Sequence, residues 1–176
     1  MMAILYGPST LEGRFFMRAK NHAVSVSVFR LASFLPFRLV AVTESVYRVF
    51  AENYEVSFNL TIPEIRALSV IAEFGTLSPT AVGQHALMDK VKVSRATQSL
   101  VAKGLLHQRQ DPRDGRSRLL RLTRKGTATY ARFVPLATRL ESMLFDGLSR
   151  ADRNALNRVL TKITTRLEMI GGIDAS

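Results

Sequence analysis

The chain has 176 residues, of which 47% are hydrophobic, and it carries a formal net charge of +11 at pH 7. This length and composition fit one domain with a buried core and argue against a disordered chain. Cysteine is absent, the three histidines lack the spacing of metal ligands, and no apolar run is long enough to span a membrane, so we expect no disulfide, metal, cofactor or membrane insertion.

Residues 1–32 read as an N-terminal extension of unclear role. The positive charges of this segment follow its first apolar run instead of preceding it, which argues against a signal peptide. The extension could pack on a dimer, contact DNA through its basic residues or be mobile, and the sequence does not decide among these alternatives.

A long amphipathic helix is predicted to start near Pro36. Apolar residues recur there at alternating spacings of four and three: Leu35, Leu39, Val42, Val46 and Val49. Such a stripe is almost that of a coiled coil, so this helix needs a helical partner.

Two shorter helices are predicted next. Thr61 and Glu64 have the spacing of a capping box, and the helix that they begin ends at Gly75. Ser78 precedes a third helix, on which we expect Gly83 to allow the close approach that a helix-turn-helix requires.

The fourth predicted helix begins after Asp89, ends at Gly104 and has two different faces. Its inward stripe consists of Val93, Ala96, Thr97 and Leu100. Its other positions are mostly small or hydrogen-bonding residues: Val91, Lys92, Ser94, Arg95, Gln98, Ser99 and Ala102. This face suits a helix that enters a DNA major groove, although an ordinary surface helix with solvated charges would look similar.

A β-hairpin with a basic tip is predicted directly after this helix. Two short apolar-bearing runs, 105–108 and 119–122, flank turn-forming residues. Arg113 and Arg116 at the tip could reach a DNA minor groove, with Asp114 supporting the turn and orienting a guanidinium. We interpret the hairpin as a wing.

Most of the positive charge lies in this part of the chain. Eleven lysines and arginines but only two aspartates occur between Lys90 and Lys125. Nucleic acid is the commonest partner of such a concentrated positive charge.

Two long helices are predicted after the wing. Thr123 begins the first, in which we expect a kink at Pro135, and Ser149 and Asp152 begin the second. With the first helix of the chain they present more apolar surface than one small domain can bury, which favours a dimer over the alternative of a self-contained bundle.

The runs DKVKVSRATQSLVAKGLL, DPRDGR and LTRKG, in this order, resemble the MarR family of winged helix-turn-helix transcription factors. The resemblance covers residues 34–170 and implies a homodimer that binds palindromic operator DNA, usually as a repressor released by a small ligand. Two positions depart from the family pattern: Gly115 stands where the wing often has a third arginine, and Leu87 where the inter-helix turn often has glycine. The family's peroxide-sensing cysteine is absent.

The expected fold is mainly α with a small β wing, a winged helix-turn-helix with long N- and C-terminal dimerisation helices. We expect this domain at 33–170, with a DNA-binding core at 61–122, dimerisation helices at 33–56 and 123–170, and a C-terminal tail at 171–176.

Double-stranded DNA is the expected partner of the recognition helix and wing. We expect Ser94, Arg95 and Gln98 to read bases or anchor the helix. The full set of predicted DNA contacts is Lys92, Ser94, Arg95, Gln98, Ser99, Lys103, Arg113, Arg116 and Arg118, with Arg121 as a further phosphate contact.

A small-molecule effector is implied only by the resemblance, which places it between the dimerisation helices and the winged domain. Tyr47, Arg48, Arg66 and His85 are candidates for binding a phenolic or carboxylate ligand, and each fits equally well as a packed or solvated residue.

Two other functions were weighed. An enzyme acting on nucleic acid is not supported, because no paired carboxylates, triad or Gly-rich phosphate loop occurs. An architectural or protein-interaction module that binds DNA without sequence preference stays open. We expect a cytoplasmic, nucleoid-associated homodimer that represses transcription and responds to a ligand.

Overall fold

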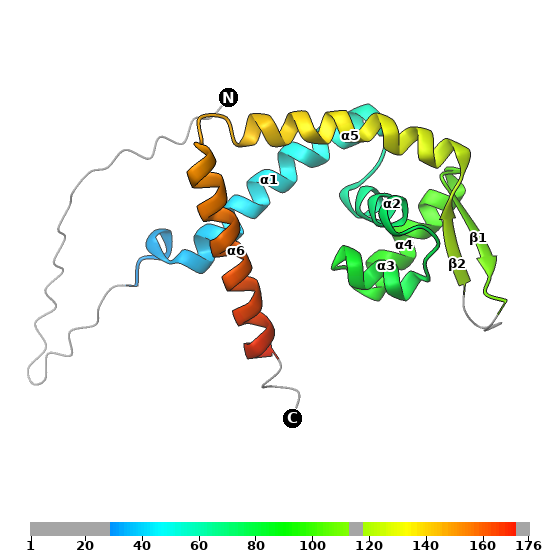
Figure 1. Cartoon of the computed structure of the whole chain (residues 1–176). Coiled ribbons are helices and arrows are strands. Elements are labelled where there is room, and N and C mark those ends of the chain that lie inside the picture. Colours follow the sequence, from blue (N-terminus) through cyan, green and yellow to red (C-terminus); the bar gives the residue numbers. More distant parts are fainter. Residues whose placement is uncertain (1–28, 113–117, 172–176) are drawn as a thin grey trace, which may run out of the picture. The chain divides into compact units, whose positions relative to one another are not determined.

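The computed structural model describes residues 29–112 and 118–171. They form six α-helices, one 3-10 helix and a two-stranded antiparallel sheet (Figure 1). In chain order the elements are η1 (Leu31–Ser33), α1 (Leu35–Phe58), α2 (Ile62–Phe74), α3 (Pro79–Ala86), α4 (Lys90–Ala102), β1 (Leu106–Gln110), β2 (Arg118–Leu122), α5 (Arg124–Leu144) and α6 (Arg150–Gly171). The mainly helical fold with a small β wing is as the sequence predicts.

The chain divides into two units, residues 1–38 and 39–176. The described part of the first unit contains η1 and an edge-to-face contact between Phe29 and Phe34, whose ring centroids are 5.1 Å apart. The second unit contains the helix-turn-helix and the wing, and the following description concerns that unit.

The helices of the DNA-binding core begin at the caps that the sequence predicts. The Glu64 carboxylate accepts a hydrogen bond of 2.7 Å from the Thr61 backbone N–H, and the Thr61 hydroxyl accepts from the Glu64 backbone N–H, which completes the capping box. At the starts of α3, α4 and α5 the side chains of Ser78, Asp89 and Thr123 each accept a hydrogen bond from the backbone N–H three residues later.

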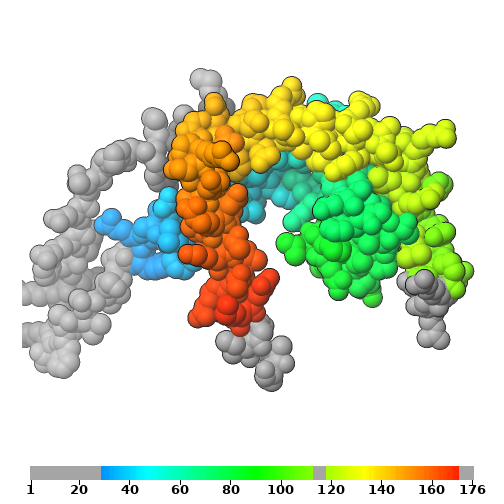
Figure 2. Space-filling model, in the orientation of Figure 1, coloured from blue at the N-terminus to red at the C-terminus, as the bar shows by residue number. Residues whose placement is uncertain are grey.

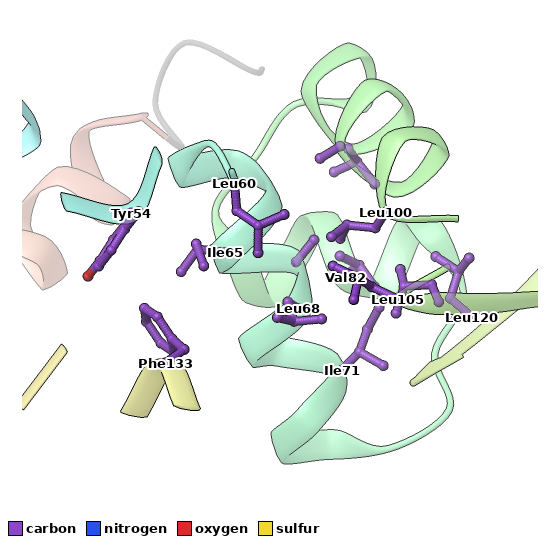
Figure 3. Packing of buried hydrophobic residues seen from close by; sticks show 14 of the residues in the cluster. Tyr54, Leu60, Ile65, Leu68, Ile71, Val82, Leu100, Leu105, Leu120 and Phe133 are labelled. Carbon is purple, nitrogen blue, oxygen red and sulfur yellow. The ribbon is translucent and has the colours of Figure 1, made fainter. Parts of the chain in front are cut away.

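The core lies between α2, α3, α4 and the sheet (Figure 3). Leu68 of α2, Val82 of α3, Leu100 of α4 and Leu120 of β2 are all fully buried in it. In Figure 2 the atoms of the green segment, which includes these helices, form one closely packed body. All four residues of the predicted inward stripe of α4 are buried. This packing fixes how α4 is rotated about its own axis.

The turn between α3 and α4 is tight. A Cβ atom on Gly83 would lie 3.1 Å from the Met88 carbonyl oxygen and 3.2 Å from Val93 Cγ2, which confirms that glycine is needed for close approach. Leu87 ends α3 in the left-handed region at φ 52°, a conformation that suits the glycine often found here in the resembled family, and its side chain is 82% exposed.

The wing is attached to the core at two points. Leu77 and Leu120 exchange backbone hydrogen bonds of 3.1 and 2.8 Å, which join the segment before α3 to β2. The first turn of α5 packs against the Leu105 carbonyl, because Gly126 leaves no side chain between them. From there α5 continues without interruption through Pro135.

Aromatic rings connect α1 to α5. Tyr54 and Phe133 are in edge-to-face contact with ring centroids 5.2 Å apart, and Phe50 and Phe58 pack beside them. Burial raises the pKa of the Tyr54 hydroxyl.

Large apolar side chains remain exposed on the long helices. Those on α1 from residue 39 onward are Leu39, Val40, Val42, Tyr47, Val49 and Val56, and those on α6 are Leu156, Val159, Leu160, Leu167, Met169 and Ile170. None of the described side chains of α6 is buried. Over residues 29–112 and 118–171, none of the helices combines the length and apolar character that crossing a bilayer requires.

We predict that Gly126→Ala lowers the free energy of unfolding by about 1–3 kcal/mol, because its Cβ would overlap the Leu105 carbonyl oxygen. Gly83→Ala is the matched control, since both glycines lie in helices but a Cβ at Gly83 would come no closer than 3.1 Å to its neighbours, which need to shift by much less than the Leu105 carbonyl. Urea unfolding should show a larger loss for Gly126→Ala, and an equal loss would contradict this account of the α5 attachment.

Candidate nucleic-acid interface

The outward face of α4 is exposed as predicted. Val91, Arg95, Gln98 and Ala102 all lie in solvent, opposite the buried stripe. Since a helix turns about 100° per residue, burying the stripe necessarily directs these positions away from the core. The face therefore offers a guanidinium and an amide with little bulk around them.

Gln98 is held in place by its neighbour one turn earlier. Its Nε2 donates a hydrogen bond of 3.2 Å to the Ser94 hydroxyl. Besides the N–H used in this bond, a glutamine amide has a second N–H donor and an acceptor oxygen. A glutamine amide can pair with the N6 and N7 edge of adenine, so the side chain is preorganised for base contact.

Lys92 lies at the exposed start of α4 and pairs with its own N-cap. Its ammonium is 3.1 Å from Asp89 Oδ2, and the two side chains are 65% and 55% exposed. The Lys92 backbone N–H, and then its ammonium, lower the pKa of the Asp89 carboxyl. Exposed ion pairs of this kind contribute little to the stability of the fold, so a DNA phosphate can replace the Asp89 carboxylate as the partner of the Lys92 ammonium.

A groove of about 720 Å³ runs between α3, α4 and the sheet. Its polar lining comes from Thr80 and Gln84 of α3, Lys90, Ser94, Thr97 and Gln98 of α4, and Gln108 and Arg118 of the wing strands. None of the described lining residues is acidic. The groove thus combines hydroxyl, amide and cationic groups beside the exposed face of α4.

The sequence did not single out Thr80, Gln84 or Gln108. Thr80 and Gln84 are four residues apart, so they share one face of α3, and that spacing was the available signal. Gln108 lies on β1, where its position relative to the groove depends on strand pairing that local sequence does not show.

Only one face of the wing lines the groove. In the register of the hairpin Gln108 pairs with Leu120 and His107 pairs with Arg121. Because side chains alternate along a strand, Gln108 and Arg118 lie on the face that lines the groove, and Arg121 lies on the opposite face. The predicted phosphate contact of Arg121 is therefore not on the groove side.

The wing tip lies outside the described residues. Arg113, Asp114 and Arg116, together with Gly115, belong to the 113–117 segment, so their predicted roles stay predictions.

Lys103 and Ser99 differ from the expectation that they face DNA. The Lys103 ammonium donates hydrogen bonds of 2.8 Å to Glu64 Oε1 and 2.7 Å to the Asn59 carbonyl oxygen. The Ser99 hydroxyl also lowers the pKa of the Glu64 carboxyl, which is 3% exposed. The Lys103 ammonium is directed toward the protein, where it supplies a partner for a buried carboxylate.

The charge of Glu64 is stabilised by this network. Burial on its own would raise the pKa of the Glu64 carboxyl, but hydrogen bonds from Lys103, Ser99 and the Thr61 backbone outweigh it, so the pKa is lowered. The side chain is ionised at neutral pH and pairs with the lysine.

The residues predicted for an effector line neither the groove beside α4 nor the hollow described below, and their role stays a prediction. His85 stacks on Phe74 with ring centroids 4.2 Å apart, and Tyr47, Arg48 and Arg66 are exposed. An apolar hollow of about 390 Å³ lies elsewhere between α1 and α5, and its lining, which includes Phe50, contains none of the four.

No three His, Asp or Glu side chains converge as metal ligands within the part of the chain that the structure describes.

Comparisons with known proteins find similar chains among transcriptional regulators. The model of the MarR family matches residues 58–117. The HTH-type transcriptional repressor IacR of Pseudomonas putida is 26% identical over 150 residues, which cover 85% of this chain and 89% of that protein.

Two solved structures have similar folds. BpsR of Bordetella bronchiseptica, whose DNA binding is regulated by 6-hydroxynicotinic acid, is 25% identical, with a TM-score of 0.73 over 78% of this chain and 98% of that one. The PcaV transcriptional regulator of Streptomyces coelicolor, solved with its natural ligand, is 22% identical, with a TM-score of 0.71 over 80% and 98%.

We predict that Glu64→Gln reduces the loss of stability in acid. Because the folded-state pKa of Glu64 is lowered, its carboxylate stabilises the parent fully above its usual pKa, and this contribution is lost as the pH falls through the lowered value. Urea unfolding between about pH 5 and pH 3 should show a shallower decline for the variant. Glu73→Gln, at an exposed position on the same helix, controls for the loss of one carboxylate; a Glu64→Gln profile parallel to the parent's would count against the network.

Proposed function

Since this chain is a MarR-family winged helix-turn-helix regulator, we propose that it binds a palindromic operator as a homodimer and represses transcription. Proteins of this family are DNA-binding transcription factors and not enzymes. The observation that carries the proposal is the exposed face of α4 beside a groove whose described lining has cations and amides but no carboxylate.

The charge at the start of α4 supports DNA binding. Lys90 and Lys92 lie in its first turn, which has no acidic residue. A helix N-terminus is already positive, so cations there oppose the helix dipole and do not help the fold. The same charges attract phosphate, which explains their presence.

Each side chain is given a role by its position. Arg95, Gln98 and Ser94 read base edges in the major groove, and Lys92 and Arg118 contact phosphates on either side of α4. The wing tip, through Arg113 and Arg116, extends to the flanking minor groove, with Asp114 supporting it.

Dimerisation is supported by the exposed apolar faces of α1 and α6. Monomeric proteins rarely leave such continuous apolar surface in solvent, and a second copy related by a two-fold axis would cover it. The two copies of α4 would then enter successive major grooves about 34 Å apart, which requires a palindromic site.

A small aromatic acid is the proposed effector. BpsR and PcaV, with similar folds, are each described with a small ligand. The hollow between α1 and α5 offers aromatic walls from Phe50, Tyr130 and Phe133. A ligand there would act by favouring one spacing of the two recognition helices over another.

The proposal predicts sequence preference, which an architectural module would lack. Duplexes selected from a random library by the purified chain should compete for binding at least tenfold better than unselected duplexes of equal length. A gel-shift competition measures this, and repeating it with benzoate or nicotinate derivatives searches for the effector. Equal competition by both duplex sets would favour the architectural alternative.

We predict that Arg95→Ala weakens binding to a selected duplex by about 1–3 kcal/mol and relaxes its specificity, because a base-reading arginine is lost. Binding to random DNA should change much less. Arg66→Ala, which removes an exposed arginine from α2, is the control and should leave both affinities unchanged in the absence of effector. Unaltered selectivity of Arg95→Ala would mean that the reading face is wrongly assigned.

A further inference from the structure

Lys103 is bonded to three other parts of the chain. Through its ammonium it contacts the Asn59 carbonyl oxygen, just after α1, and Glu64, in the first turn of α2. Its own backbone carbonyl accepts a hydrogen bond of 2.8 Å from the Lys125 ammonium, in the first turn of α5. One residue at the end of the recognition helix therefore meets the end of α1 and the beginnings of α2 and α5.

The partners of Lys103 are themselves firmly held. Glu64 is fixed by its capping box with Thr61, and both of its carboxylate oxygens accept hydrogen bonds. Asn59 has a left-handed backbone at φ 53°, a conformation that asparagine tolerates better than most residues, and its N–H donates to the Glu55 carbonyl oxygen. The ammonium thus lies in a preformed set of acceptors.

Moving the Lys103 ammonium away from these acceptors to reach a phosphate would break this arrangement. Two of the three ammonium donors are engaged inside the protein, and the side chain is 31% exposed against 4% for Glu64. Moving the ammonium toward DNA would leave a buried carboxylate without its cation, which is strongly unfavourable.

We propose that the Lys103 side chain is a positioning group that ties the carboxyl end of α4 to the end of α1 and the start of α2 and does not bind DNA. The inference rests on the proposed function, because the elements it joins are those that would pair the subunits and those that would read the operator. A shift at the end of α1 or the start of α2 is passed to α4 through the bonds of the Lys103 ammonium, and a chain of packed and hydrogen-bonded groups of this kind can carry coupling between distant sites.

The salt dependence of binding separates positioning from phosphate contact. Each phosphate contact releases counterions and adds about one unit to the slope of log affinity against log salt. Operator affinity should be measured from low to moderate salt for the parent, Lys103→Met, Glu64→Gln and Arg118→Gln, with one selected duplex and one random duplex as probes. Arg118→Gln is the matched control, since its parent side chain lines the groove.

We expect Lys103→Met and Glu64→Gln to weaken binding to the selected duplex by a similar factor, about tenfold, with an unchanged salt slope and a smaller loss on random DNA. Arg118→Gln should lower the slope by about one unit on both duplexes. The Glu64→Gln result is the most telling, because removal of a negative charge from a DNA-binding surface would otherwise strengthen binding. The double variant should be no weaker than either single variant.

Two results would overturn the proposal. One is a slope lowered by about one unit in Lys103→Met together with tighter binding by Glu64→Gln, which would identify Lys103 as a phosphate ligand that Glu64 restrains. The other is unchanged affinity and selectivity in both variants. Ser99→Ala removes a hydroxyl that favours the ionised Glu64 carboxyl without changing the net charge, so it tests the same network if the other variants unfold. A smaller weakening of binding is expected, and unchanged binding would count against the proposal.

Failure of the proposed function would be recognised separately. If the parent itself showed no preference between selected and random duplexes, sequence-specific regulation would be wrong. The salt slopes of the variants on random DNA would still decide whether Lys103 contacts phosphate.

Discussion

The burial of one side of α4 against α2 determines what its other side can do. Val93, Ala96 and Leu100 lie in the core with Leu68. A rotation of α4 that moved these three side chains out of the core would expose their apolar surface to water and destabilise the fold. The direction of Arg95 follows from this packing. The reading face is therefore a consequence of the core and does not need separate stabilisation.

Features that depend on neighbours three or four residues away were predictable from the sequence. The capping box of Thr61 and Glu64, the cap at Asp89 and the end of α4 before Gly104 are local hydrogen-bonding and backbone requirements, and the structure contains all of them. The role of Gly83 was predictable because a helix-turn-helix imposes a close approach at a known offset. Local signals of this kind were enough for the fold.

Features that depend on distant partners were not predictable in the same way. Lys103 reads as one more cation in a basic stretch, since its partner Glu64 is 39 residues away and already explained by its cap. Ser99 has the same partner. Arg121 is different: its odd separation from Arg118 along one strand already indicates opposite faces, so the sequence contained that signal.

Two lysines, one in the first turn of α4 and one directly after its last residue, show how burial of the partner carboxylate decides the role of a charge. Lys92 and Lys103 each pair with one carboxylate, at 3.1 and 2.8 Å. The partner of Lys92 is in water, so phosphate can take its place without leaving a desolvated charge behind. The partner of Lys103 is buried, and loss of the cation from a buried pair costs about 3–5 kcal/mol. Identical charges on α4 thus divide into one that can exchange its partner for DNA and one that holds the helix in the position from which the other acts.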